Sequence, residues 1–156
     1  MNVRKATLDD IDAITALLSQ VLEVHAKARP DLFVSGTVKY NKSELADIIS
    51  NEATPVFVCE DDSLVLGHAF TEITVNTQQT MLKGMKSMYI DDICVDEKAR
   101  RKNVGTMLYD HCIEYARKIG CYDVTLNVWE GNDSAKQFYQ SMGMRVRKTT
   151  LEQILG

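Results

Sequence analysis

The stretch that decides the fold runs from Tyr89 to Gly105 and reads Tyr-Ile-Asp-Asp-Ile-Cys-Val-Asp-Glu-Lys-Ala-Arg-Arg-Lys-Asn-Val-Gly. It predicts a strand with two carboxylates in its middle, then a short basic turn, then a helix that begins near the last glycine. Cations and backbone N–H groups at a helix N-terminus form a site for phosphate. A carboxylate on the preceding strand can accept a proton from a reacting group at a site where a phosphorylated carrier is bound. The stretch therefore indicates an enzyme that uses a phosphorylated carrier.

The bulk composition is that of a globular protein. The 156 residues, with 45% hydrophobic and 26% charged side chains, predict a single domain over 1–156. The net charge of −4 argues against a general nucleic-acid binder, because no broad basic field supports counterion release. No window approaches the roughly 18 apolar residues of a membrane span, and the first residues lack the apolar core of a signal peptide. We expect a cytoplasmic protein with no nucleic-acid or membrane partner.

The cysteines and histidines show no metal-ligand spacing. Buried free thiols are expected at Cys59, Cys94, Cys112 and Cys121, with no zinc site, no disulfide and no metal chemistry. His68 and His111 are expected to have structural roles. His25 lies near Glu23 at the end of the first predicted helix and could line an acceptor pocket.

Hydrophobic periodicity predicts the order of the elements. Helices are expected over 8–23, 42–50, 104–119 and 132–142. Strands are expected over 55–60, 64–75, 87–95, 122–128 and 144–151, with a hairpin turn at 61–63 and loops at 29–41 and 76–84. The order α-α-β-β-β-α-β-α-β predicts an α/β fold with a mixed, largely antiparallel central sheet flanked by helices. Its two β-α-β units should be right-handed.

The basic turn at 100–105 does not match a known nucleotide loop. Gly-x-x-x-x-Gly-Lys-Ser/Thr is absent, and no Gly-x-Gly-x-x-Gly follows a strand, so a dinucleotide fold is not expected. Taken by itself, the turn also fits a solvated loop between a strand and a helix.

The downstream segment 125–144 adds a second pattern. It contains Asn132-x-x-Ala135-x-x-Phe138-Tyr139 followed by Gly143, while the turn supplies Arg100-x-x-x-x-Gly105 between a strand and a helix. With the element order, which matches over nearly the whole chain, these two motifs make the chain resemble the Gcn5-related N-acetyltransferase (GNAT) family. Proteins of that family use acetyl-coenzyme A (acetyl-CoA).

The resemblance implies a set of coenzyme-binding residues. Backbone groups late in the central strand would hold the pantetheine arm, and a bulge or splay there would leave an N–H free to polarise the thioester carbonyl. The turn and the start of the helix would hold the pyrophosphate, and two asparagines would reach the pantetheine or the amine. The implied set is Ile93, Cys94, Val95, Arg100, Arg101, Lys102, Asn103, Val104, Gly105, Thr106, Asn127, Asn132 and Ala135.

The resemblance also implies catalytic roles. Tyr139 would donate a proton to the departing thiolate, while Phe138 is expected to be a core aromatic residue. An alkyl ammonium has a pKa of about 10, so a base is needed. Asp91 would serve directly or through water, and Asp92 competes for that role, although either carboxylate could be structural. Strict strand alternation would place Asp91 on one face with Ile93 and Val95, and Asp92 on the other with Ile90 and Cys94.

Two residues depart from the family pattern. Arg101 and Asn103 stand where the family commonly has glycine. Asparagine tolerates a positive φ better than most residues, so the turn can form. Its side chain could crowd the pyrophosphate, whereas Arg101 could add a phosphate contact.

The expected activity is transfer of an acetyl group from acetyl-CoA to a primary amine by direct attack. A ping-pong route through Cys94 lacks an apparent base partner. The segment 89–95 is similar to the corresponding strand of diamine acetyltransferases, which favours a small amine or a polyamine, and acidic residues at Glu23, Asp31, Asp91 and Asp92 would suit a cation. A protein α-amine or lysine is the alternative acceptor. A non-catalytic acyl-CoA-binding module is the alternative from another class, and the family also suggests a homodimer.

Overall fold

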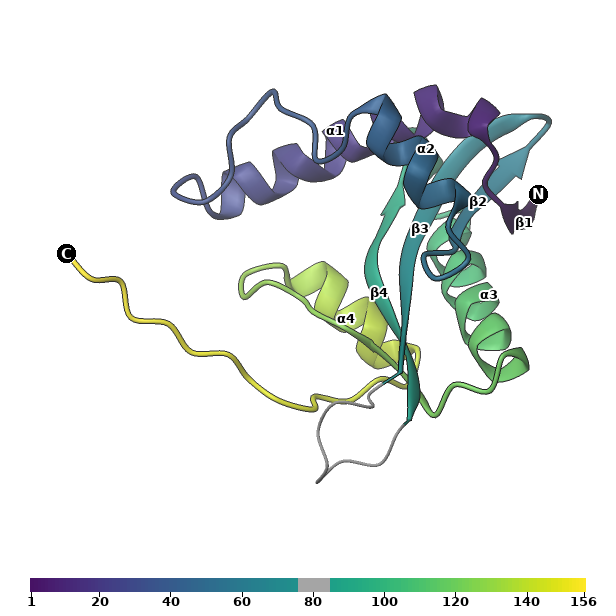
Figure 1. The fold of residues 1–156 in the computed structure, drawn as a ribbon. Coiled ribbons are helices and arrows are strands. Elements are labelled where there is room, and N and C mark those ends of the chain that lie inside the picture. The colour runs from purple at the N-terminus through teal and green to yellow at the C-terminus, as the bar shows by residue number, and fades with distance from the viewer. Residues whose placement is uncertain (76–84) are drawn as a thin grey trace.

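The computed structural model describes residues 1–75 and 85–156 (Figure 1). The chain forms four α-helices and five strands in this part, with two short 3-10 helices. In chain order the elements are β1 Asn2–Lys5, η1 Leu8–Asp10, α1 Ile11–Ala28, α2 Lys42–Ser50, β2 Val56–Asp61, β3 Leu64–Val75, β4 Lys86–Val95, η2 Glu97–Ala99, α3 Val104–Lys118, β5 Asp123–Leu126 and α4 Asp133–Ser141.

The strands form one sheet in the order β1-β2-β3-β4-β5. Neighbouring strands are antiparallel except β4 and β5, which are parallel and are connected by α3. The predicted mixed, largely antiparallel sheet flanked by helices is confirmed. The hairpin between β2 and β3 is also confirmed, and its turn residues Asp62 and Ser63 have φ angles of 47° and 66°.

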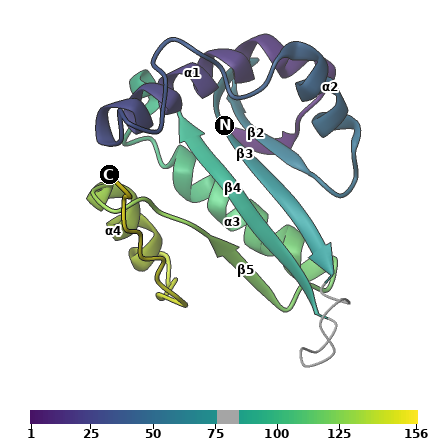
Figure 2. The same cartoon turned by 60° about the vertical axis from the view of Figure 1, so that its left-hand side comes forward.

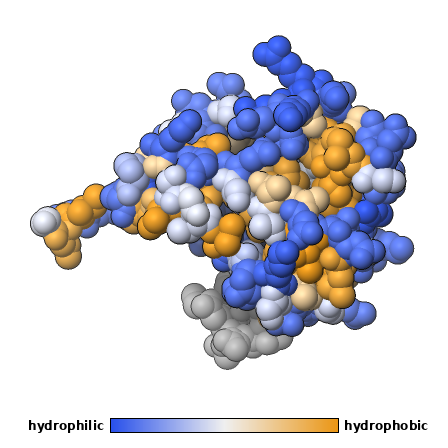
Figure 3. All heavy atoms as spheres, turned by 90° about the horizontal axis from the view of Figure 1, so that it is seen from above, coloured by the Kyte–Doolittle hydropathy of each residue, from blue (hydrophilic) through white to orange (hydrophobic). Residues whose placement is uncertain are grey.

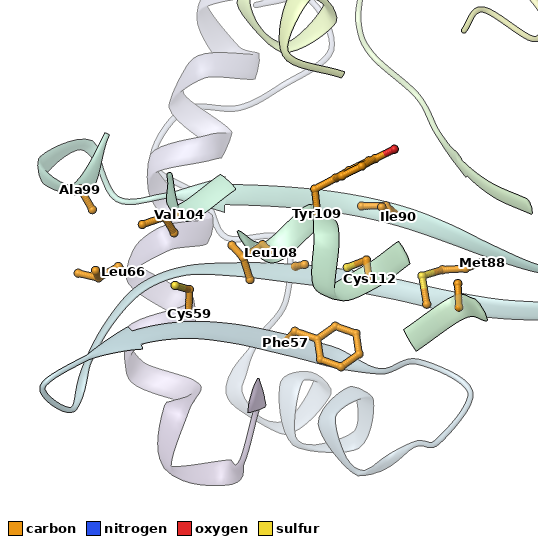
Figure 4. Close-up of a cluster of buried hydrophobic side chains, with 12 residues drawn as sticks. Phe57, Cys59, Leu66, Met88, Ile90, Ala99, Val104, Leu108, Tyr109 and Cys112 are labelled. Atoms are coloured by element: carbon orange, nitrogen blue, oxygen red, sulfur yellow. The ribbon is translucent and has the colours of Figure 1, made fainter. Parts of the chain in front are cut away.

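Helices cover both faces of the sheet. On one face, α3 presents Val104, Leu108 and Cys112 to apolar residues of the strands (Figure 4). On the other face, Ile14 and Leu18 of α1 and a leucine of α2 pack on the strand residues Val56, Val58 and Phe70. Fully burying one such side chain contributes about 1.5–3 kcal/mol, so these two layers account for much of the driving force for folding.

The first helix is longer than predicted. Instead of a helix over 8–23, a 3-10 turn precedes α1, which continues to Ala28. The residues after Glu23 include good helix formers, and the helix ends at Ala28. The next residue, Arg29, is not helical, and it precedes Pro30, whose ring disfavours a helical conformation there. The strand β1 was not predicted, because it has four residues and little apolar character.

The predicted strand over 144–151 is wrong for this structure. Residues 144–156 belong to no helix or strand. The strand predicted over 122–128 is shorter, since β5 ends at Leu126. The remaining predicted helices and strands agree to within two residues, and the loop predicted at 76–84 lies outside the described residues.

Three of the four cysteines are buried, the fourth, Cys121, is half-buried, and all are free thiols. The prediction of free thiols is confirmed, and burial holds for all but Cys121. In the described ranges, no helix combines the length and the apolar character needed to cross a membrane.

Candidate active site

A β-bulge lies at Asp91 in the middle of β4. Thr71 of β3 pairs with Ile90, and Phe70 pairs with Asp92, so Asp91 is an extra residue opposite a continuous β3. The bulge reverses the alternation of side chains. Ile90 packs in the α3 core before it, and Ile93 and Val95 pack against the same core after it. The predicted grouping of Asp91 with Ile93 and Val95, and of Ile90 with Cys94, is therefore wrong.

Strands β4 and β5 separate directly before the bulge. Their ladder runs from Ser87 and Asp123 to Ile90 and Leu126 and ends there. Figure 2 shows the two strands diverging beyond that point. Among the described residues, the edge of β4 over 91–95 has no strand partner on the β5 side. A splay was predicted at 93–95 and is present; the bulge lies slightly earlier in the strand.

A cleft of about 290 Å³ lies along this unpaired edge. Helices α1 and α4 form its other walls, through Gln20, Val21, Val24, Ser134 and Phe138. The predicted site residues that line the cleft are Ile93, Cys94, Val95, Arg100, Gly105, Asn132, Ala135 and Tyr139. The structure thus brings β4, the basic turn at 100–105 and helix α4, which carries Tyr139, together around one cleft.

The basic turn has a strained backbone at the two positions where glycine was expected. Arg101 and Asn103 have φ angles of 67° and 62°, in the left-handed region that favours glycine. Together with Lys102, these two residues are exposed and lie outside the cleft lining. Their predicted contacts with a pyrophosphate therefore stay predictions.

The start of α3 offers open backbone donors. Within the described residues, the Asn103 side chain makes no capping hydrogen bond, and the first turn of α3 contains no acidic residue. Val104 is buried in the core, so only its backbone can reach a ligand, and Thr106 is half-buried. Open N–H groups, the helix dipole and the nearby Arg100 favour an anion here.

Gly105 lies at the bottom of this anion site. A Cβ atom built on it would meet Phe138 Cζ at 3.5 Å, an ordinary contact, and its φ is not in the left-handed region. Among the described residues, no contact and no backbone conformation requires glycine at this position. A glycine that lines a cleft allows a ligand to approach the backbone closely. The residues present at this helix start fit the phosphates of acetyl-CoA.

Asp92 is held by a buried histidine. His68 Nε2 lies 3.1 Å from Asp92 Oδ1, and the His68 side chain is fully buried. Within the described residues, His68 Nδ1 has no hydrogen-bond partner. The tautomer with its proton on Nε2 therefore leaves no buried N–H unpaired. Sequence reasoning gave His68 a structural role; the structure makes it the residue that orients Asp92.

Asp91 faces a different neighbour. Its carboxylate forms an ion pair with the ammonium of Lys39, from the loop between α1 and α2. Burial lowers the pKa of Lys39, but the hydrogen bond from Lys39 to Asp91 and the nearby negative charges outweigh it and raise that pKa. The two candidate bases thus differ, since Asp91 already binds an alkyl ammonium and Asp92 binds a histidine.

Tyr139 lies in the cleft wall opposite β4. Burial, and then the negative charge of Asp92, raise the pKa of the Tyr139 phenol well above its ordinary value. The ring packs against Tyr109 and Phe138, so its position is fixed by aromatic contacts. Phe138 packs in the core as predicted, although one side of it also lines the cleft. The Tyr139 phenol is therefore held in its protonated form at the cleft wall.

Cys94 is unsuited to act as a nucleophile. Its thiol donates a hydrogen bond to the Leu17 carbonyl at 3.2 Å, and burial raises its pKa to about 12. His68 lies opposite Cys94 in the β3–β4 register, but its Nε2 is bound to Asp92. The thiolate that a ping-pong route requires is therefore disfavoured.

The asparagines have local partners. Asn132 accepts a hydrogen bond from the Ala135 N–H and caps α4. Asn127 donates to Tyr89 Oη at 3.3 Å and is not part of the cleft lining. Asn127 therefore lies next to Tyr89. Burial and then the negative charge of Asp91 raise the pKa of the Tyr89 phenol.

An aromatic cluster lies at the end of α1, where the sequence predicted only His25. Phe33 stacks on His25 with ring centroids 5.1 Å apart and meets Trp129 edge-on at 5.5 Å. Burial lowers the pKa of His25, and the negative charge of Asp92 opposes this shift only in part. Phe33 and Trp129 are 96 positions apart in the sequence, so no local pattern could have joined them.

Two of the acidic residues expected to suit a cationic substrate, Glu23 and Asp31, are bound to groups of the protein itself. Glu23 accepts hydrogen bonds from Ser35 Oγ and the Gly36 N–H. Asp31 forms an ion pair with Arg29 at 2.7 Å. Of the four acidic residues expected to suit a cation, Glu23 and Asp31 are therefore engaged by the loop after α1.

Comparison with known proteins agrees with this geometry. The model of the Acetyltransferase (GNAT) family matches residues 18–144. The chain belongs to the GNAT family. It is therefore an acetyltransferase of the GNAT kind, and the resemblance inferred from the two motifs is confirmed. Proteins of this family normally use acetyl-CoA.

Relatives of this GNAT protein are found in bacteria and archaea. The uncharacterized N-acetyltransferase YhfO of Bacillus subtilis is 27% identical over 144 residues, which cover 92% of this chain and 89% of the relative. An uncharacterized N-acetyltransferase of Methanocaldococcus jannaschii is 28% identical over 148 residues, which cover 94% of this chain but 61% of that relative.

Solved structures share the fold. A tetramutant of the BH1408 protein from Bacillus halodurans is 31% identical, with a TM-score of 0.94 over 99% of this GNAT chain and all of that one. An acetyltransferase of Trypanosoma brucei is 21% identical, with a TM-score of 0.73 over 99% of each chain, which is a likeness of fold.

Proposed function

We propose that this protein transfers the acetyl group of acetyl-CoA directly to a primary amine, with a small amine or polyamine as the preferred acceptor. The observation that carries the proposal is the cleft in which the splayed edge of β4, the start of α3 and Tyr139 meet. Each of these parts supplies a different requirement of acyl transfer: extended backbone contacts, an anion site and a proton donor.

The coenzyme lies along two of these parts. Arg100 and the open N–H groups at the start of α3 hold the pyrophosphate, and Gly105 allows it to approach the backbone. The unpaired edge of β4 over 93–95 offers N–H and carbonyl groups to the amides of the pantetheine arm. An N–H on the same edge can donate to the thioester oxygen as negative charge develops there. Acetyl-CoA supplies the activated acyl group.

Asp92 is the proposed base, and Asp91 the proposed anchor for the cationic acceptor. His68 holds Asp92 in position. The negative charge of Asp92 contributes to the raised pKa of Tyr139 and of Cys94, and both of these residues line the cleft. Asp91 pairs with the Lys39 ammonium, the same chemical group that an amine substrate carries in water. An incoming ammonium can therefore replace Lys39 on Asp91 and lose its proton to Asp92, directly or through water.

Tyr139 completes the transfer by donating its proton to the departing coenzyme A thiolate. Its raised pKa keeps the phenol protonated at neutral pH. Cys94 stays protonated and bound to the Leu17 carbonyl, so the amine attacks the thioester without an acyl-enzyme stage.

The preference for a small amine rests on Asp91 and on an aromatic cluster outside the cleft lining. His25, Phe33 and Trp129 form this cluster at the end of α1, and aromatic faces attract alkyl ammonium groups. A protein α-amine or lysine is the alternative acceptor. An acyl-CoA-binding module without catalysis is the alternative from another class.

A panel of acceptors tests the proposal. Purified protein is mixed with acetyl-CoA and, in turn, with aliphatic diamines, polyamines, a peptide with a free α-amine and a lysine peptide, and thiol release is followed. Release that is fastest with the diamines or polyamines supports the proposal. Fastest release with a peptide moves the acceptor to the alternative class. Coenzyme A binding measured by calorimetry, without release for any amine, leaves only the binding module.

A further inference from the structure

Lys39 places an ammonium group at the bulge of β4. The residue lies in the loop between α1 and α2, and its Nζ forms an ion pair with Asp91, the extra residue of the bulge. Figure 1 shows this loop on the upper side of the molecule, and Figure 3 shows that side from above as a mixture of hydrophilic and apolar residues. A lysine on such a surface ordinarily extends its ammonium into water. The Lys39 ammonium instead contacts the strand that carries both candidate bases.

Aromatic neighbours hold the Lys39 side chain in this direction. Its Nζ lies 5.3 Å from the centre of the Tyr40 ring, a distance at which the ring attracts a cation. The Tyr40 ring packs on Phe70 of β3 with centroids 5.9 Å apart, and Phe70 pairs with Asp92 in the β3–β4 register. The Lys39 side chain is also 45% exposed, so it is held next to β4 without being locked in the core.

Lys39 meets the requirements that the proposed function sets for an acceptor. Asp91 is the proposed anchor for an alkyl ammonium, and Lys39 already places such a group on it. Asp92, the proposed base, is the next residue of β4, and its negative charge also contributes to the raised pKa of Lys39. The same charge contributes to the raised pKa of Tyr139, the proposed proton donor. Lys39 is therefore a tethered primary amine within electrostatic reach of the catalytic groups.

We propose that Lys39 is an internal acceptor, acetylated on Nζ by acetyl-CoA bound to the same chain; this inference rests on the proposed function. Lys39 leaves Asp91 and gives one proton to Asp92, and its neutral Nζ attacks the acetyl carbonyl carbon. The C–N bond forms as the C–S bond of the thioester breaks, and the thiolate takes the proton of Tyr139. The second proton lost from Nζ returns to the Tyr139 phenolate. The products are acetylated Lys39, coenzyme A and one proton, which Asp92 releases to water.

The tether both favours this reaction and gives it a consequence. An amine held at the site by its own chain reacts at a high effective concentration, so Lys39 is modified when no external amine is present. Acetylation removes the positive charge that pairs with Asp91. Asp91 is then open to the ammonium of an external acceptor, and the modified protein should bind a cationic amine more tightly than the unmodified one.

Labelling without an amine tests the proposal. Protein is incubated with isotopically labelled acetyl-CoA, and peptide mass spectrometry follows the label on each lysine. Lys39 should be labelled at least tenfold faster than Lys42, the matched control, whose ammonium also pairs with an aspartate, Asp12 at 3.0 Å, but is 74% exposed on the surface. The rate per molecule should not depend on protein concentration, because the acceptor is in the same chain. Equal labelling of the two lysines, or a rate that rises with protein concentration, overturns the proposal.

Two variants separate catalysed from spontaneous acetylation. Asp92→Asn and Tyr139→Phe should each slow the labelling of Lys39 by about tenfold or more, because each removes a proton transfer, and should leave the labelling of Lys42 unchanged. If Lys39 is labelled at the wild-type rate in both variants, it reacts with acetyl-CoA without the site, and the proposal is overturned.

Initial rates with an aliphatic diamine test the consequence. Protein that is fully labelled at Lys39 and freed of acetyl-CoA should have a KM for the diamine about two- to fivefold lower than fresh protein, the range that a partly exposed ion pair supports. An unchanged KM overturns the opening of Asp91. Thiol release in the acceptor panel without label on Lys39 overturns this inference and leaves the proposed function standing, whereas neither release nor label overturns both.

Discussion

His68 Nε2 lies 3.1 Å from Asp92 Oδ1, so a fully buried ring on β3 fixes a carboxylate on β4 one residue after the bulge. The bond uses one oxygen of Asp92, and among the described residues no hydrogen bond engages Oδ2. A carboxylate with one oxygen fixed and one open has the geometry of a positioned proton acceptor. Asp91, one residue earlier, binds Lys39 instead.

Asparagine substitutions separate the roles of these two carboxylates. Asp92→Asn should lower kcat about 10²- to 10³-fold, because it removes the proton acceptor. Asp91→Asn should raise KM for a polyamine about tenfold, equivalent to about 1.4 kcal/mol of lost attraction, with little change in kcat. Steady-state thiol release over a range of amine concentrations measures both. The reverse pattern, a kcat effect at Asp91 alone, would make Asp91 the base.

His68 is a positioning residue, and two substitutions test that role. His68→Ala should lower kcat about tenfold or more and leave KM for acetyl-CoA unchanged, because Asp92 is no longer oriented. His68→Gln should recover part of the rate, because its amide N–H can still donate to Asp92. A purely structural histidine would give both variants the same loss of thermal stability without a difference in kcat between them.

Tyr139→Phe should lower kcat about 10²-fold or more while coenzyme A affinity stays within about twofold, because only the proton is lost. The pKa of Tyr139 is raised, so the phenol remains protonated and competent up to and beyond a pH of about 10, the ordinary value. The wild-type rate should therefore show no alkaline decline from Tyr139 between pH 7 and pH 10. Calorimetry with coenzyme A and a pH profile measure the two effects, and a variant with the full wild-type rate would remove Tyr139 from the mechanism.

Gly105→Ala should leave the fold intact but weaken coenzyme A binding about tenfold or more. The added methyl meets Phe138 at an ordinary distance, and alanine is a better helix former than glycine by about 0.5–1 kcal/mol, so thermal stability should hold or rise. The methyl instead occupies the side of the helix start where the phosphate approaches. Calorimetry and thermal melting measure the two effects separately.

Gly67→Ala is the contrasting control. A Cβ atom at Gly67 would lie 2.8 Å from the Cys94 carbonyl oxygen and 2.9 Å from Val104 Cγ1, both inside the core. This substitution should cost about 1–3 kcal/mol of stability through overpacking. If Gly105→Ala were as destabilising as Gly67→Ala, Gly105 would be a packing glycine.

Arg101 combines backbone strain with a positive charge, and two substitutions divide them. Arg101→Gly relieves a left-handed conformation that costs about 1–2 kcal/mol, less about 0.4–1 kcal/mol for the freer unfolded chain. It should raise the Tm by a few degrees, while Arg101→Ala should not. Both variants lose the cation, so an equal loss of coenzyme A affinity assigns a phosphate contact to Arg101. If the Arg101→Gly and Arg101→Ala variants had equal melting temperatures, the proposed backbone strain at Arg101 would be contradicted.

Local sequence signals predicted the elements that local chemistry determines. Helix α2 begins after Asn41, which caps it through the Glu44 N–H, and the β2–β3 hairpin turns at Asp62 and Ser63. These residues act on backbone groups within three positions of themselves, so a reading of the sequence can find them. The paired motifs around Gly105 and Tyr139 likewise located the two walls of the cleft.

The features that were missed depend on contacts between distant residues. Strand β1 exists because it pairs with β2 and because Arg4 binds Asp10 and Glu60. The bulge at Asp91 depends on the register with β3, which strict alternation within β4 cannot reveal. The segment 144–156 has the composition of a strand but forms no ladder in this structure, although the described edge of β5 is open, so composition alone does not decide pairing.

The most direct test of the central claim follows an isotopically labelled acetyl group. Protein, labelled acetyl-CoA and a polyamine are incubated, and mass spectrometry measures the label on the amine and on the protein while free thiol is counted. The account predicts one labelled amide for each thiol released and no label on Cys94. Labelled Cys94, or bound coenzyme with no labelled amine from any primary amine tested, would contradict it.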